Sequence, residues 1–269
     1  RRGVFGTAVY DPATTRRTES GFARDAFAGN QVPASRNDRA ALAVVDRYPA
    51  PNVFTASGVE AGVNNYRRLG NDDTAAHQFD GRLDRYFGGH HRVFGRYSFL
   101  RDDSRPARPL ADGSGNLTSG VIGDTLTRAD SLAAEHTWNL SAAAVNQLRF
   151  GYTRRKFDRN SLRTGRPVGE TTLIPNIPVS SFDDVLPTYD IVGMQQLGPP
   201  ASGNAAFTTS VTQVIENFST VRRGHSLKAG FDLRLETLDV LQPPSPTGNF
   251  QFTNIFTAGL SPAGSVAAN

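Results

Sequence analysis

Residues 226–236 decide the fold class, because their apolar and polar side chains alternate without a break. The segment reads Ser226-Leu227-Lys228-Ala229-Gly230-Phe231-Asp232-Leu233-Arg234-Leu235-Glu236. Successive side chains of a β-strand point to opposite faces of a sheet, so every second residue shares a face. One face of this segment is therefore apolar or small, and the other carries mainly charged and polar groups. An amphipathic α-helix would instead place apolar residues three or four positions apart.

The same alternation occurs in two earlier pairs of segments, which we expect to form β-hairpins with their apolar faces in register. The first pair covers residues 78–87 and 92–99, around a turn at 88–91. The second covers residues 131–140 and 147–155, around a turn at 141–144. In a third hairpin, residues 211–221 precede the segment above, with the turn at 222–225. A seventh strand is expected through Phe250 and Phe252.

The connections between these hairpins are long, whereas the turns within them are short. Residues 100–128, 158–206 and 239–248 separate the predicted strands, all of which lie within 76–269. We expect residues 1–75 to form a further long loop region with one short helix near 38–48, capped by Asn37 or Asp38. Tight turns at one end of the strands and elaborate loops at the other are typical of an outer-membrane β-barrel.

Composition and length exclude several other classes of protein. The chain has 269 residues, 38% of them hydrophobic, and no cysteine for a disulfide framework or a thiolate site. No stretch approaches 18 consecutive apolar residues, so we expect no transmembrane helix. The net charge of +4 is spread along the chain, which argues against nucleic acid as a partner. The first residues do not form a signal peptide, and we interpret the sequence as a fragment of a longer chain.

Alternation alone does not distinguish a membrane barrel from a β-sandwich, because both have one apolar face. A barrel turns this face toward lipid, and a sandwich buries it against a second sheet. Strands of about ten residues, aromatic residues near the strand ends and long loops at one end favour the barrel. The sequence therefore predicts an all-β fold, an antiparallel transmembrane β-barrel segment that supplies about six or seven strands of a larger barrel.

A series of short motifs runs along nearly the whole chain. In the first 75 residues they are Tyr10-Asp11-Pro12-Ala13-Thr14-Thr15-Arg16, Phe27-Ala28-Gly29-Asn30-Gln31-Val32-Pro33-Ala34-Ser35-Arg36 and Tyr48-Pro49-Ala50-Pro51-Asn52. Those in the predicted strands are Gln78-Phe79-Asp80-Gly81-Arg82-Leu83-Asp84, Phe94-Gly95-Arg96-Tyr97-Ser98, Asn146-Gln147-Leu148-Arg149-Phe150-Gly151-Tyr152 and Gly224-His225-Ser226-Leu227-Lys228-Ala229-Gly230. In order and spacing they resemble the barrel portion of TonB-dependent outer-membrane receptors of the Oar-like group.

The resemblance implies a barrel of about 22 strands closed around an N-terminal plug. It also implies that outer loops capture a ligand, which enters when energy from the inner membrane moves the plug. The plug domain is absent from this sequence, so the TonB complex would act through N-terminal parts outside it. The short turns would be periplasmic and the long loops extracellular. The implied partners are outer-membrane lipid, the TonB complex and a transported ligand that the sequence does not identify.

No motif indicates catalysis, a cofactor or a metal site. The chain lacks HExxH, Cys/His ligand patterns, a GxSxG elbow and a Walker loop, so we expect no enzymatic activity and no cofactor. His77, His136 and His225 have no ligand partner nearby in the sequence. The side chains of His90 and His91 diverge on an extended chain, which makes joint chelation by these neighbours unfavourable. We interpret all five histidines as polar strand or turn residues.

Two functions remain open at this point. In the first, the chain is a segment of a TonB-dependent receptor in the cell outer membrane, and the polar strand faces line its lumen. In the second, it is a secreted or surface β-rich adhesion or binding module, and the apolar strand faces form a protein core. For the first function, the candidate lumen-lining residues are Asp80, Arg82, Asp84, Arg96, Glu135, Arg149, Lys228, Asp232 and Arg234.

Overall fold

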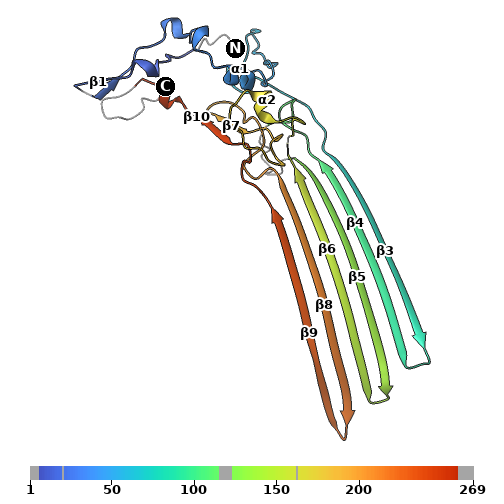
Figure 1. Ribbon diagram of the computed structural model, residues 1–269. Coiled ribbons are helices and arrows are strands. Elements are labelled where there is room, and N and C mark those ends of the chain that lie inside the picture. Colours follow the sequence, from blue (N-terminus) through green and yellow to red (C-terminus); the bar gives the residue numbers. More distant parts are fainter. Residues whose placement is uncertain (1–5, 20, 115–122, 162, 260–269) are drawn as a thin grey trace.

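The computed structural model describes residues 6–19, 21–114, 123–161 and 163–259. Its main element is an antiparallel sheet of six strands in the order β3–β4–β5–β6–β8–β9 (Figure 1). The strands are β3 (Asp73–Phe87), β4 (His91–Arg105), β5 (Asp124–Ser141), β6 (Ala144–Asn160), β8 (Ala205–Arg222) and β9 (His225–Leu241). Each strand pairs with the next long strand along the chain. The fold is therefore all-β and antiparallel, as the alternating segments predict.

The strands of this sheet are longer than the sequence predicts. They contain 15–18 residues instead of the expected length of about ten. That prediction was wrong because the apolar alternation covers only the part of each strand near the short turns. Residues 101–105 of β4, for example, are Arg, Asp, Asp, Ser and Arg, yet they remain paired with β3. Backbone pairing thus continues beyond the apolar pattern and carries charged side chains toward the loops.

The short turns all lie at one end of the sheet, where the sequence predicts them (Figure 1). In the β8–β9 turn, Arg223 and Gly224 have positive φ angles of 50° and 80°. Two such residues in succession define a type I′ turn, whose twist matches the right-handed twist of paired strands. The β3–β4 turn also places two glycines, Gly88 and Gly89, at positive φ. These turns fix the register of the hairpins that they close.

The expected seventh strand exists, but it does not join the six-stranded sheet. β10 (Asn249–Phe252) pairs in parallel with β7 (Thr188–Ile191). The Phe250 ring packs on Tyr189, with ring centroids 5.5 Å apart, among residues of the loop core. Two aromatic residues at alternate positions cannot distinguish a sheet face from a packed loop, because each place buries an apolar side chain. Adding this segment to the barrel strands was therefore wrong.

The remaining elements are short and lie beyond the end of the sheet opposite the turns (Figure 1). They are η1 (Pro12–Thr14), β1 (Arg16–Thr18), β2 (Gly21–Ala23), η2 (Ala28–Asn30), η3 (Ala34–Arg36), α1 (Arg39–Val45), α2 (Val168–Thr172) and η4 (Asn254–Phe256). The Asp38 side chain caps α1 by accepting a hydrogen bond from the Ala41 backbone N–H at 3.0 Å. None of the helices in the described ranges is long and apolar enough to span a membrane.

The buried apolar core lies among the loops and not in the sheet. Its buried members are Val44, Leu110, Val168, Leu186, Tyr189 and Leu197. They come from α1, from the β4–β5 connection and from the β6–β8 connection, and Phe250 packs against them from the segment after β9. We call this set the loop core. Segments that are far apart in sequence therefore form one packed assembly at the end of the sheet.

Neither face of the sheet is covered by a second layer of the described chain (Figure 1). On β9, Phe231, Leu233 and Leu235 are 56%, 65% and 65% exposed. On the opposite edge strand, Leu83 is 82% exposed. A soluble sandwich would bury such side chains against a second sheet. An uncovered apolar face of this extent needs an apolar environment, which the hydrocarbon of a membrane provides.

Candidate functional site

All the candidate residues from the sequence lie on one face of the six-stranded sheet. Side chains of residues that pair across antiparallel strands point to the same side. Arg82 pairs with Arg96, Glu135 pairs with Arg149, and the register continues through β8 to Asp232. We call this side of the sheet the charged face. Its members from the predicted set are Asp80, Arg82, Asp84, Arg96, Glu135, Arg149, Lys228, Asp232 and Arg234.

On β3 and β4, the charged face holds a hydrogen-bonded cluster. Asp84 accepts hydrogen bonds from Arg82 Nε at 2.7 Å and from Arg92 Nη2 at 3.0 Å. Asp80 accepts a hydrogen bond from the Ser98 hydroxyl at 2.5 Å. Charge-assisted hydrogen bonds of this kind orient both partners. The acids of β3 are therefore held in place by basic and hydroxyl groups of the same two strands.

The same arrangement continues across the rest of the sheet. On β5 and β6, Arg149 Nε donates to the Glu135 carboxylate at 2.7 Å. On β8 and β9, the Gln213 amide donates to both carboxylate oxygens of Asp232, at 2.8 and 3.0 Å. Exposed ion pairs stabilise a fold by only about 0–1 kcal/mol each, so these contacts can exchange partners at small cost. The charged face therefore offers a hydrated wall with charges of both signs.

Sequence reasoning missed two residues that belong to these contacts, Arg92 and Gln213. Arg92 begins the predicted strand 92–99, but its contact with Asp84 follows only from the pairing of β3 with β4. Gln213 was missed because β8 also places the apolar residues Val211 and Ile215 on the charged face, which obscures the alternation. The register with β9 resolves this ambiguity, because Ile215 pairs with Asp232.

Toward the loops, the charged face becomes partly apolar. Phe157 on β6 pairs with Phe207 on β8, which pairs with Val240 on β9. The two phenyl rings lie with their centroids 6.0 Å apart. Arg155 lies over the Phe157 ring, with its guanidinium carbon 5.9 Å from the ring centroid. This end of the face can therefore contact apolar or aromatic groups as well as charged ones.

The opposite face of the sheet carries a continuous band of apolar side chains near the short turns. We call it the apolar band. On β9 it extends from Leu227 to Leu235, which corresponds to roughly 26 Å along the strand at about 3.3 Å per residue. A tilted strand of this length crosses the hydrocarbon of a bilayer. Its members are Phe79, Leu83, Phe87, Val93, Tyr97, Phe99, Leu132, Ala134, Trp138, Leu140, Leu148, Phe150, Tyr152, Val214, Phe218, Leu227, Ala229, Phe231, Leu233 and Leu235.

Two histidines meet on the face of the apolar band, close to the short turns. His91 Nδ1 lies 3.0 Å from His136 Nε2, and the His91 ring lies 5.4 Å from the Trp138 ring between centroids. Sequence spacing could not reveal this pair, because pairing of β4 with β5 joins residues 45 positions apart. The described residues hold no group of three or more side chains that could bind a metal ion.

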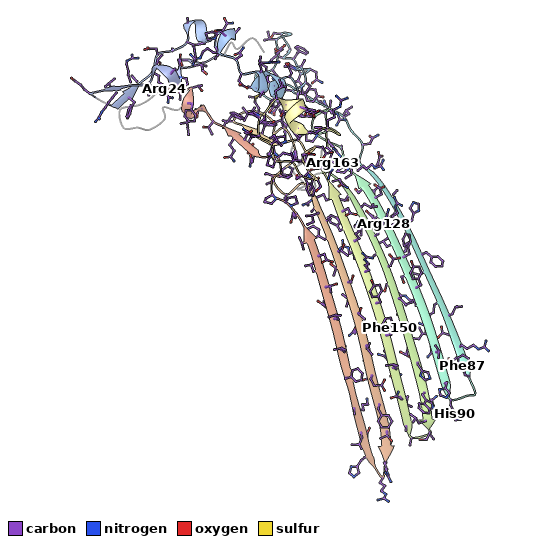
Figure 2. All side chains as sticks on the ribbon, viewed as in Figure 1. Arg24, Phe87, His90, Arg128, Phe150 and Arg163 are labelled. Atoms are coloured by element: carbon purple, nitrogen blue, oxygen red, sulfur yellow. The ribbon has the colours of Figure 1, made fainter. Side chains whose placement is uncertain are left out.

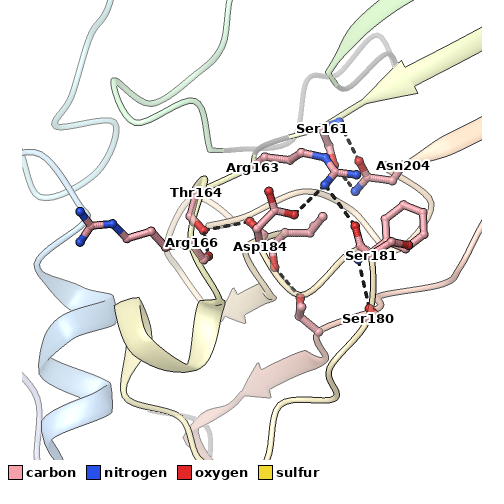
Figure 3. Close-up of polar contacts among 11 residues, drawn as sticks. Ser161, Arg163, Thr164, Arg166, Ser180, Ser181, Asp184 and Asn204 are labelled. Atoms are coloured by element: carbon pink, nitrogen blue, oxygen red, sulfur yellow. Dashed lines mark hydrogen bonds and ion pairs between the residues drawn. The ribbon is translucent and has the colours of Figure 1, made fainter.

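Polar contacts hold the long β6–β8 connection in place (Figure 3). Arg163 Nη1 donates to the Asp184 carboxylate at 2.7 Å and to the Ser181 carbonyl oxygen at 3.2 Å. The Asn204 amide donates to the Ser161 hydroxyl at 2.6 Å, and its oxygen accepts from the Ser161 backbone N–H at 3.1 Å. Ser161 and Asn204 are both buried, so this contact ties the two ends of the connection together.

An ion pair joins two of the motifs in the N-terminal region. Arg36 donates hydrogen bonds of 2.8 and 2.9 Å to the two carboxylate oxygens of Asp11. These bonds, together with one from the Ala13 backbone N–H, hold the pKa of Asp11 below its usual value. The same contact raises the pKa of Arg36. This contact therefore joins residues 10–16 to residues 27–36.

A sheet that presents ionic groups on one face and an uncovered apolar band on the other needs water on one side and lipid on the other. Among strand proteins, the transmembrane β-barrels meet this requirement. A protein-family model described as an outer membrane beta barrel domain matches residues 1–269. The chain therefore belongs to this family, and its location is the outer membrane. No curated protein and no solved structure gives a match to the chain.

Proposed function

We propose that the chain is part of a TonB-dependent outer-membrane receptor of the Oar-like group, which takes up a ligand through a plugged β-barrel. The observation that carries the proposal is the charged face, to which five strands contribute ionic residues opposite the apolar band. In this proposal, the nine candidate residues of the charged face line the lumen. The resemblance of the sequence motifs to Oar-like receptors supports the assignment to this group among the outer-membrane barrels.

The loop core supports a role in ligand capture. It packs α1, the β4–β5 connection and the β6–β8 connection together at one end of the sheet. A loop assembly with its own core presents a defined surface, whereas separate flexible loops would lose more conformational entropy on binding. We assign the loop end to the extracellular side and the short turns to the periplasm. Coupling to TonB would use N-terminal parts of the whole protein, and no residue described here is assigned a catalytic step.

Uptake can be tested without knowing the ligand. Cells that make the full-length protein are compared with a strain lacking its gene and with a strain lacking TonB. Mass spectrometry of the growth medium measures which compounds each strain removes. We expect one class of compounds to be removed only when both the protein and TonB are present.

Two results would contradict the proposal. Removal that continues without TonB would show an uptake route that is not TonB-dependent. Unchanged removal in the strain lacking the gene, together with lost attachment to surfaces or cells, would favour the adhesion module.

The double variant Glu135→Gln/Arg149→Gln tests the charged face directly, because it removes one ion pair without changing the net charge of the lumen wall. We expect slower uptake by this variant at an unchanged level of folded protein.

A further inference from the structure

Basic side chains gather on the same face as the apolar band, beyond the band on the side of the loops. Arg101 on β4 pairs with Arg128 on β5, which pairs with Lys156 on β6, so three cations stand side by side. Arg154 lies two residues before Lys156 on the same face. We call these four residues the basic cluster. Figure 2 shows Arg128 nearer to the loops than Phe150, which belongs to the apolar band.

Neighbouring acids neutralise only part of the basic cluster. Lys156 Nζ lies 3.2 Å from the Asp158 carboxylate on its own strand. Arg101 reaches Asp103 only at 4.0 Å, and Asp103 is shared with a second arginine. The other two members of the cluster have no ion-pair partner in the described part of the chain. The cluster therefore keeps an excess of positive charge at the loop-side border of the apolar band.

Asp130 is the acid closest to the two unpaired arginines in the register, because it pairs with Arg154 across β5 and β6. Its carboxylate accepts a hydrogen bond from the Tyr97 hydroxyl at 2.6 Å and forms no ion pair with either arginine among the described residues. Both arginines are exposed. They are thus available to an anion that approaches from outside the sheet.

The width of the basic cluster indicates the size of this anion. Adjacent strands are about 4.8 Å apart, so Arg101 and Lys156 are separated by roughly 10 Å at the backbone. Like charges side by side on a sheet destabilise it unless a counter-charge lies between them. One phosphate group cannot contact the whole cluster, whereas two phosphates on one headgroup can. Guanidinium groups also match the geometry of phosphate oxygens in two-point hydrogen bonding.

We propose that the basic cluster binds a membrane lipid whose headgroup carries two phosphates, in the leaflet that borders the loops. The acyl chains of this lipid lie along the neighbouring part of the apolar band, around Leu132 and Tyr152. The phosphates then meet the cluster at the level where hydrocarbon gives way to headgroups. The proposal rests on the outer-membrane location and on the charges of this face, and it does not depend on the receptor function.

The experiment uses the full-length protein, purified in a neutral detergent, and native mass spectrometry to measure bound lipid. The probes are lipid A, lipid A with both phosphates removed, and inorganic phosphate. We expect lipid A to bind at least tenfold more tightly than its dephosphorylated form, and millimolar inorganic phosphate not to displace it. Arg128→Gln/Arg154→Gln should weaken lipid A binding by roughly tenfold or more, because each basic residue near a membrane surface adds to headgroup attraction.

Arg155→Gln is the matched control, because Arg155 is also exposed and follows Arg154 on the same strand but points to the charged face. It should leave lipid A binding unchanged. Arg128→Lys/Arg154→Lys keeps the charge but loses the two-point hydrogen bonds, so its binding should lie between that of the unchanged protein and that of the glutamine double variant. Circular dichroism checks that each variant keeps its strand content. Equal binding of the dephosphorylated lipid, displacement by inorganic phosphate, or an equal loss in Arg155→Gln would each overturn the proposal.

Discussion

Leu233 and Arg234 are adjacent in the chain, but their side chains point into different surroundings. Leu233 belongs to the apolar band, whereas Arg234 lies on the charged face with its Nε 2.5 Å from Glu236. Leu233→Arg should reduce the free energy of unfolding in lipid by about 2–4 kcal/mol, because it places a charge in hydrocarbon. Arg234→Ser should cost about 1 kcal/mol or less, since exposed ion pairs contribute little. Urea titrations in lipid vesicles measure both, and equal losses would contradict the assignment of the faces.

Glu216 is an acidic residue within the apolar band. It pairs with Leu148 on one side and with Phe231 on the other, and it has no ion-pair partner among the described residues. A carboxylate on the lipid side of a barrel opposes insertion, though less than a basic residue does. Glu216→Leu should therefore raise the free energy of unfolding in lipid vesicles by about 1–2 kcal/mol.

Asn217→Leu is the control for this prediction, because the neighbouring residue lies at the same depth on the charged face. It should not stabilise the protein in the same urea titration. A loss of stability in Glu216→Leu would show that this carboxylate has a stabilising role in the membrane-embedded protein.

At the level of elements, the β8–β9 hairpin depends on the backbone of its turn. Gly224 has a φ of 80°, and a Cβ atom added there would meet no atom within 4 Å. Gly224→Ala should therefore destabilise the protein by about 1 kcal/mol through backbone strain alone. Gly95→Ala on β4 is the control, because it also has open space around the added Cβ but no positive φ. The shift in the urea midpoint distinguishes strain from crowding, and equal shifts would contradict this explanation.

The sequence predicted the position and facing of some strands of the sheet better than those of others. β9 was predicted because its alternation continues without interruption through the apolar band. β8 was ambiguous, because Val211 and Ile215 lie on the charged face, and β10 was assigned to the wrong sheet. All nine candidate residues share a face because alternation fixes the side of each strand. Their individual contacts, such as Gln213 with Asp232, required the register between strands.

At the scale of the whole molecule, the sheet has two open edges. Among the described strands, β3 and β9 are each hydrogen-bonded on one side only. Unpaired backbone groups at membrane depth are costly, because hydrocarbon offers no hydrogen bonds. Further strands beside β3 and β9 would satisfy these groups, in agreement with a larger barrel of which this sheet is one part of the wall.

The loop core gives the molecule a distinct response to alkaline pH. Burial raises the pKa of Tyr189 to about 12, and burial together with nearby Asp190 and Asp112 does the same for Tyr48. Each tyrosine binds its proton more tightly in the folded loop core than in the unfolded chain, where its pKa is about 10. Its contribution to stability is therefore complete below a pH of about 10. This stability is lost as the pH rises toward 12. The absorbance of tyrosinate during an alkaline titration should therefore show a late phase.

Tyr48→Phe and Tyr189→Phe should each remove part of this late phase. Tyr86→Phe is the control, because Tyr86 is 69% exposed on β3 and lies outside the loop core. Complete ionisation of all tyrosines in one step near pH 10 would contradict the raised pKa of these two residues.

The sequence by itself determined the all-β class, the short turns, and the shared face on which the nine candidate residues lie. These features depend on neighbours along the chain, because side-chain direction alternates with every residue of a strand. Tertiary structure alone decided the length of the strands, the place of β10, the contact between His91 and His136 and the composition of the loop core. These features depend on contacts between residues that are distant in sequence, and strand register and loop packing bring such residues together.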